Sequence, residues 1–116
     1  MVRVFVYNLK FNQIAAVNKA CAAVGGSVVN IKKDDLHKSI ESLIDSTKGA
    51  KAGKDALVEP TELLIFDNFS SEAMDEFLDA YNSTGVPKVI FKAAITPINR
   101  KWTPAYLYEQ LKQEIK

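Results

Sequence analysis

The stretch from residue 95 to residue 104, Ile-Thr-Pro-Ile-Asn-Arg-Lys-Trp-Thr-Pro, carries side chains well suited to recognising a small ligand. Arg100 offers a planar guanidinium that can bind an oxyanion through two parallel hydrogen bonds, and Asn99 offers an amide. Thr96 adds a hydroxyl group and Trp102 an aromatic ring. A structural interpretation is equally open, in which Asn99 and Arg100 brace a proline-rich connection and Trp102 packs beneath it.

Further polar candidates follow the two most apolar runs of the chain. Asn8 and Lys10 come after residues 2–7, and Asp67 and Asn68 come after residues 63–66. If these runs are parallel strands of an open sheet, their carboxyl ends meet at one edge, where such sheets bind ligands. The alternative is that these side chains only end strands and form turns. The predicted ligand site comprises Asn8, Lys10, Asp67, Asn68, Thr96, Asn99, Arg100 and Trp102.

Patterns typical of catalysis and of metal or cofactor binding are absent from the sequence. One cysteine, Cys21, and one histidine, His37, with no paired carboxylate spacing, cannot build an ordinary metal site. Residues 49–55 are one residue short of a phosphate-binding loop, and Asp55 replaces the hydroxyl that binds magnesium. We therefore assign no catalytic residue, no metal and no cofactor.

Segments with strand and helix character alternate along the chain. Four apolar or β-branched segments predict strands at residues 2–7, 27–31, 63–66 and 89–95. A helix is expected after each strand, because an apolar stripe at helical spacing follows a capping residue. The predicted caps are Asn12, Asp34 or Asp35, Ser70 or Ser71, and Thr103, and the last helix has an apolar seam of Leu107, Leu111 and Ile115.

This βαβαβαβα order predicts an α/β three-layer sandwich with a four-stranded parallel sheet, because parallel neighbours need helical crossovers. The two most apolar strands should be central, which gives the strand order 2-1-3-4. Right-handed crossovers would then place the first and last helices on one face and the middle two on the other. The length of 116 residues predicts a single domain over residues 1–116.

Composition restricts the partners. Fifteen Lys and Arg against fourteen Asp and Glu leave a net charge of +1, which argues against nucleic acid as a partner. No apolar segment is long enough to span a membrane and none resembles an export signal, so we expect a cytoplasmic protein. The strand at residues 89–95 either forms a homodimer through its edge or is guarded by Lys88 and Lys92.

The motif T-P-x-N-R-x-W-T at residues 96–103 follows F-x-x-F-S at residues 66–70 and V-P-K-V at residues 86–89. This combination resembles a small family of bacterial domains of unknown function. The resemblance implies an α/β fold and a loop of interest at the rim, and no activity. We expect a small binding or regulatory module whose crevice, at the carboxyl ends of strands 1, 3 and 4, takes a small anionic ligand. The alternative is a cryptic enzyme acting on such a substrate with Asp67, Lys92 and Arg100.

Overall fold

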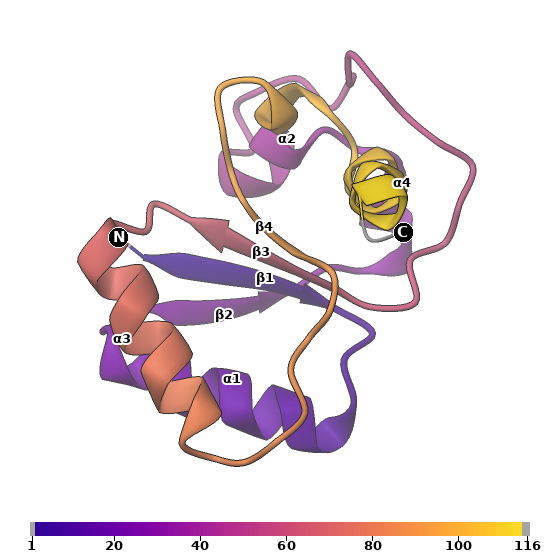
Figure 1. Cartoon of the computed structure of the whole chain (residues 1–116). Coiled ribbons are helices and arrows are strands. Elements are labelled where there is room, and N and C mark those ends of the chain that lie inside the picture. Colours follow the sequence, from indigo (N-terminus) through magenta and orange to yellow (C-terminus); the bar gives the residue numbers. More distant parts are fainter. Residues whose placement is uncertain (1, 115–116) are drawn as a thin grey trace. The chain divides into compact units, whose positions relative to one another are not determined.

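The computed structural model describes residues 2–114, which alternate between strands and helices as predicted (Figure 1). The elements are β1 (Arg3–Tyr7), α1 (Phe11–Ala23), β2 (Ser27–Asn30), the 3-10 helix η1 (Lys33–His37), α2 (Ile40–Ile44), β3 (Leu63–Asp67), α3 (Ser71–Asn82), β4 (Lys92–Ala94), the 3-10 helix η2 (Asn99–Lys101) and α4 (Pro104–Glu114). The predicted seam residue Ile115 lies outside the described residues. The α/β class is therefore confirmed.

The chain divides into two compact units. Unit 1 comprises the chain up to Asn30 together with Glu62–Ala94, and unit 2 comprises Ile31–Thr61 together with the chain from Ile95 onward. All four strands of the described residues, together with α1 and α3, belong to unit 1. A single cooperative domain over residues 1–116 stays a prediction.

The sheet of unit 1 has the predicted strand order, β2-β1-β3-β4, but it is mixed. β1 is parallel to β2 and β3 is parallel to β4, whereas β1 and β3 are antiparallel. The prediction of a purely parallel sheet is therefore wrong. Between β2 and β3 the chain runs through Ile31–Thr61, which belongs to unit 2, so no crossover helix of unit 1 forces β3 to run parallel to β1.

The two halves of unit 1, β1-α1-β2 and β3-α3-β4, are related by an approximate two-fold axis between β1 and β3. The two-fold operation converts the pairing Arg3↔Asp67 into the pairing Tyr7↔Leu63, so the register of β1 and β3 is consistent with this symmetry. Each central strand is followed by an asparagine with left-handed backbone, Asn8 at φ 56° and Asn68 at φ 63°. Asparagine tolerates this conformation better than most residues do. The halves therefore share one strand-to-helix turn, a repeat that is structural and is not visible as sequence identity.

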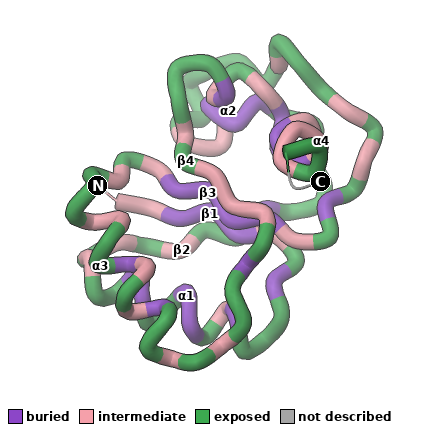
Figure 2. The backbone as a smooth tube through the Cα atoms, in the orientation of Figure 1, coloured by how far each residue is buried: buried purple, intermediate pink, exposed green. Residues whose placement is uncertain are grey.

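One face of the sheet is covered by α1 and α3, which lie side by side (Figure 1). The prediction that paired the first helix with the last on this face is wrong, because the neighbour of α1 is α3. Figure 2 shows β1 and β3 mainly as buried backbone. The buried residues of this core are Val4, Val6, Leu9, Ala16, Val17, Ala20, Cys21, Leu64, Phe66, Phe77, Tyr81 and Val89.

Three elements differ from their predicted bounds. The prediction of Asn12 as the cap of the first helix is wrong: α1 begins at Phe11 with Lys10 at the cap position, where the Gln13 side chain accepts a hydrogen bond from the Lys10 N–H. The predicted second helix divides into η1 and a short α2, whose cap is Ser39. β4 is shorter than the predicted strand at residues 89–95.

Unit 2 contains η1, α2, η2 and α4, and an irregular segment at residues 45–61. Backbone hydrogen bonds hold this segment: Gly53 N–H donates to Lys101 O at 2.8 Å and Thr103 N–H donates to Lys54 O at 3.0 Å. Thr103 caps α4 as predicted, with its hydroxyl accepting from Tyr106 N–H. Within residues 2–114, no helix has the length and apolar character needed to cross a bilayer.

Candidate functional site

The antiparallel pairing of β1 and β3 separates four of the predicted site residues. Asn8 and Lys10 follow the carboxyl end of β1, whereas Asp67 and Asn68 lie at the carboxyl end of β3, beside Arg3 at the start of β1. These two pairs are therefore at opposite ends of the sheet. The expectation that parallel strands bring these four residues to one edge of the sheet is therefore wrong. A ligand-binding role for each residue stays a prediction.

The other four predicted site residues belong to unit 2. Thr96 and Asn99 bind each other: Thr96 N–H donates to Asn99 Oδ1 at 2.8 Å, and Asn99 N–H donates to Thr96 Oγ1 at 3.0 Å. Trp102 is half-buried and contacts Tyr106 edge to face, with ring centroids 5.0 Å apart. The buried Nε of Arg100 has no hydrogen-bond partner among the described residues. Thr96 and Asn99 thus brace the connection, in line with the structural interpretation.

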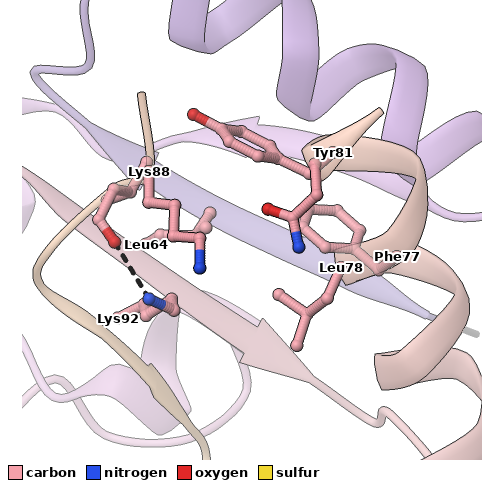
Figure 3. A pocket seen from close by; sticks show the side chains of 8 residues that line it. Leu64, Phe77, Leu78, Tyr81, Lys88 and Lys92 are labelled. Carbon is pink, nitrogen blue, oxygen red and sulfur yellow. Dashed lines mark hydrogen bonds between the residues drawn. The ribbon is translucent and has the colours of Figure 1, made fainter. Parts of the chain in front are cut away.

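A pocket of about 110 Å³ lies elsewhere in unit 1, between α3 and the segment that leads into β4 (Figure 3). We call it the α3 pocket. In Figure 3, Phe77, Leu78 and Tyr81 of α3 lie on one side, and the Lys88 side chain extends toward them from the other. Its lining residues are Leu64, Phe77, Leu78, Tyr81, Asn82, Lys88, Val89 and Lys92.

The two-fold relation between the halves of unit 1 explains why a pocket forms beside α3. Three residues connect α1 to β2, whereas nine residues, 83–91, connect α3 to β4. In the short connection Gly26 is packed so closely that an added Cβ would lie 2.8 Å from Val2 O and 3.0 Å from Cys21 Sγ. The longer connection is held by Tyr81 of α3 and Gln13 of α1, and it borders the α3 pocket with Lys88 and Val89.

Two buried polar side chains hold this longer connection in place. Tyr81 Oη donates to Pro87 O at 2.7 Å. Gln13 Nε2, from α1, lies 3.3 Å from Pro87 O and 3.4 Å from Lys88 O, while Gln13 Oε1 accepts from Lys10 N–H. Gln13 is only 4% exposed, so its amide is committed to the backbone. The pocket wall that carries Lys88 is therefore fixed from both helices.

Two of the four polar side chains that line the α3 pocket are cationic. Lys88 is exposed and takes part in no ion pair among residues 2–114, and Lys92 Nζ donates to Val89 O at 3.1 Å. Glu62 lies nearby, since its carboxylate accepts from Ile90 N–H. Burial raises the pKa of Tyr81, and the negative charge of Glu62 raises it further. Phenol, ammonium and amide groups thus line an otherwise apolar cavity.

The sequence alone does not reveal the α3 pocket. It predicts a strand from residue 89, whereas β4 begins at Lys92, so the nine-residue connection that borders the pocket is seen only in the structure. The sequence analysis considers Lys88 and Lys92 as charges that protect a strand edge, and Lys92 also as a residue of the alternative enzyme. The contribution of Gln13 has no local signal, because its backbone partners lie 74 and 75 residues away.

A second polar cluster lies in unit 2, around Asp55. Its carboxylate accepts from Thr103 Oγ1 at 2.7 Å and from Ala56 N–H at 2.8 Å, and His37 Nδ1 lies 3.0 Å away. Partial burial raises the pKa of Asp55, but these hydrogen bonds outweigh it and the net pKa is lowered. Thr103 is fully buried and caps α4, so its hydroxyl is a structural group and not a nucleophile.

No metal-binding group of three His, Cys, Asp or Glu side chains occurs among residues 2–114. Cys21 is buried, and burial raises the pKa of its thiol. This environment keeps the sulfur protonated and fits the predicted packing role.

Comparison with known proteins gives one match. Residues 62–116 match the model of a family described as a domain of unknown function (DUF3783), which confirms the resemblance to an uncharacterised domain family. Among curated proteins and among solved structures, none is significantly similar to the chain. The match covers β3, α3, β4, η2 and α4, and it includes every residue that lines the α3 pocket.

Proposed function

We propose that the chain whose residues 62–116 match this family is a small binding module, and that its ligand is a small molecule held in the α3 pocket. One observation carries the proposal: two lysine side chains reach a mainly apolar cavity whose wall is fixed by Gln13 and Tyr81. Ligand sites typically combine an apolar lining with a few convergent polar groups. A wall held by buried hydrogen bonds keeps that arrangement in the absence of ligand, which lowers the cost of binding.

This proposal keeps the predicted module and its small anionic ligand, but moves the crevice. The predicted crevice at the carboxyl ends of strands 1, 3 and 4 needs parallel central strands, and β1 and β3 are antiparallel. Of its eight residues none lines the α3 pocket. Lys92, which belongs to the predicted enzyme, does line it.

The test is a thermal-shift screen of small carboxylates, phosphates and neutral molecules, followed by variants on α3. A ligand at a hundredfold its Kd stabilises the folded state by about 2.7 kcal/mol. Leu78→Trp fills the α3 pocket and should abolish the shift produced by a hit. Glu76→Trp places the same ring at an exposed position of the same helix and should preserve it.

Equal binding by the Leu78→Trp and Glu76→Trp proteins would place the ligand outside the α3 pocket and overturn the proposal. Leu78→Ala provides a second check if Leu78→Trp does not fold, because a larger cavity should change the size of ligand preferred. A screen without any hit at millimolar concentrations would contradict a small-molecule module.

The cryptic enzyme with Asp67, Lys92 and Arg100 has less support. Asp67 Oδ2 lies 3.1 Å from Arg3 Nη2, and Lys92 Nζ donates to the backbone of Val89. Groups engaged in separate internal contacts favour a binding module over a catalytic cluster. If NMR spectra recorded over hours showed chemical conversion of a bound ligand, the enzyme would be favoured over the binding module.

A homodimer through β4 is a separate proposal about partners. β4 is a terminal strand of the sheet, and Ile90, just before it, is 59% exposed. A terminal strand can pair with a second copy, although Lys92 opposes such pairing. Sedimentation of the protein at tens of micromolar distinguishes a dimer from a strand edge that Lys92 keeps unpaired. A monomer at that concentration would exclude the dimer.

A further inference from the structure

We propose that the ligand of the α3 pocket is a monocarboxylate with a short apolar body, whose carboxylate binds Lys88 and Lys92. This inference rests on the proposed function and names its ligand class. It follows from the charges at the pocket, from the hydrogen-bond donors that remain available there, and from the size and chemistry of the lining. The charges and the donors are each tested by a separate set of variants.

The charges around the α3 pocket sum to a single positive charge. Among the lining residues Lys88 and Lys92 are cationic, and the other six are neutral. Glu62 adds one negative charge at the side of the pocket, where its carboxylate accepts from Ile90 N–H and raises the pKa of Tyr81. A monoanion balances this charge, whereas a phosphate monoester would leave an excess of negative charge at partly desolvated groups.

The donors at the pocket suit two oxygen atoms. Tyr81 Oη already donates to Pro87 O, and one proton of the Lys92 ammonium is directed to Val89 O. Each ammonium carries three donors, so Lys92 retains two for a ligand and Lys88 contributes its own. No arginine lines the pocket to grip a phosphate through a planar fork. A carboxylate bridging two ammonium groups uses the lysine donors and does not require the Asn82 amide, which also lines the pocket.

The lining residues indicate the size and polarity of the part of the ligand that lies beyond the carboxylate. Leu64, Phe77, Leu78 and Val89 present aliphatic and aromatic carbon to the cavity. The pocket volume of about 110 Å³ is smaller than the roughly 150 Å³ of a cavity that holds benzene. Because Lys88 is exposed, the charged group can remain partly in water while a short chain enters. A linear acid of four to six carbons is the expected size, on the order of that volume.

The experiment titrates the full chain with three matched probes, pentanoate, 1-pentanol and pentyl phosphate, and follows the backbone amides of α3 and residues 86–92 by NMR. We expect pentanoate to bind about tenfold more tightly than pentanol, since a charge-assisted hydrogen bond contributes about that factor. Lys88→Met and Lys92→Met should each remove this advantage and leave pentanol binding unchanged. Lys19→Met, at an exposed site on α1, should change neither.

Glu62→Gln tests the charge argument, because it removes the negative charge while its amide oxygen can still accept from Ile90 N–H. This variant should shift the preference toward pentyl phosphate about fivefold or more. Tighter binding of pentyl phosphate than of pentanoate by the unaltered protein would overturn the carboxylate assignment.

Two outcomes separate this inference from the proposed function. Equal affinity for pentanol and pentanoate would contradict the carboxylate and leave the binding module intact. Amide shifts that are confined to residues outside the α3 pocket, or that are absent with all three probes and in a wider screen, would contradict the binding module itself.

Discussion

Arg3 and Asp67 form an ion pair across the two central strands, with Arg3 Nη2 and Nε each 3.1 Å from Asp67 Oδ2. The pair exists because β1 and β3 are antiparallel, so that the first residue of one strand lies opposite the last residue of the other. The exposed fractions of the two side chains are 27% and 13%, and the bond is therefore partly shielded from water. Asp67 thus has a structural role at the position where the sequence suggested a ligand.

We expect Arg3→Ala and Asp67→Ala to be coupled in a double-mutant cycle by about 1 kcal/mol. The reason is that the bond is charge-assisted and partly buried, while two long side chains lose freedom to form it. Urea unfolding of the unaltered protein, both single variants and the double variant measures this coupling. A control cycle that combines Arg3→Ala with Asp79→Ala, on α3, should give a coupling energy near zero. Comparable coupling energies in both cycles would contradict a specific stabilising interaction between Arg3 and Asp67.

The strands themselves could be predicted from the sequence, and their directions could not. Residues 2–7 and 63–66 are continuous apolar runs, and Val4, Phe5, Leu64 and Ile65 are buried as such runs suggest. A strand buried on both faces has the same pattern whether its neighbour is parallel or antiparallel. Alternation with helices favoured the parallel arrangement, but the chain between β2 and β3 belongs to unit 2 and imposes no crossover.

The N-termini of helices were predicted well where a nearby side chain caps the backbone. Ser70 and Thr103 accept from backbone N–H groups three residues later, as their positions in the sequence indicate. The α3 pocket depends on distant contacts instead, since the Gln13 amide holds the backbone of Pro87 and Lys88. A contact between residues so far apart leaves no periodicity or motif in a single sequence.

Gln13 should contribute to stability through its buried amide. Gln13→Met keeps the size of the side chain but removes the partner of the Lys88 carbonyl and of the Lys10 N–H, while Pro87 O still accepts from Tyr81 Oη. We expect a loss of about 1–3 kcal/mol in the free energy of unfolding, which is the cost of unsatisfied buried polar groups. Asn18→Met, at an exposed position of α1, is the matched control and should change stability by less than about 0.5 kcal/mol.

The carboxylate of Asp55 should titrate below its ordinary value of 3.8. Burial raises its pKa, but hydrogen bonds from His37, Thr103 and the Ala56 N–H outweigh burial and lower it. Because the folded-state pKa is depressed, the charged group stabilises the fold above the unfolded-state value. This contribution is lost as the pH falls below about 4 through the folded-state pKa. Carbon-detected NMR of the Asp55 carboxyl group measures the midpoint directly.

His37→Ala removes one donor and should raise the midpoint of Asp55. Asp45 is the internal control, because hydrogen bonds from Thr47 lower its pKa and involve neither His37 nor Asp55. Its midpoint should stay unchanged in the same protein sample. A variant in which both carboxyl groups shift equally would point to a general loss of structure, and no shift at Asp55 would contradict the contribution of His37.

The irregular segment at residues 45–61 should show uneven hydrogen exchange. Its two glycines and three lysines suggest mobility, yet Gly53 N–H donates to Lys101 O at 2.8 Å. We expect the Gly53 amide to exchange at least about tenfold more slowly than the amides of Lys51 and Ala52, as a hydrogen-bonded group opens before it exchanges. Uniformly fast exchange from residue 48 to residue 55 would show that the segment is mobile despite this hydrogen bond.

Arg100 and Trp102, two residues apart, should differ in what they contribute to stability. Trp102 is half-buried and its ring contacts Tyr106, so Trp102→Ala should lower the free energy of unfolding by about 2–3 kcal/mol. Arg100→Ala removes a buried Nε that has no partner among the described residues, and the relief of this group offsets the lost packing of the side-chain stem. We expect a change within about 0.5 kcal/mol for Arg100→Ala. Urea unfolding ranks the two variants, and Trp102→Phe should recover part of the loss because a ring can still contact Tyr106. The opposite ranking would show that Arg100 braces the connection between β4 and α4, while Trp102 is free to contact a partner.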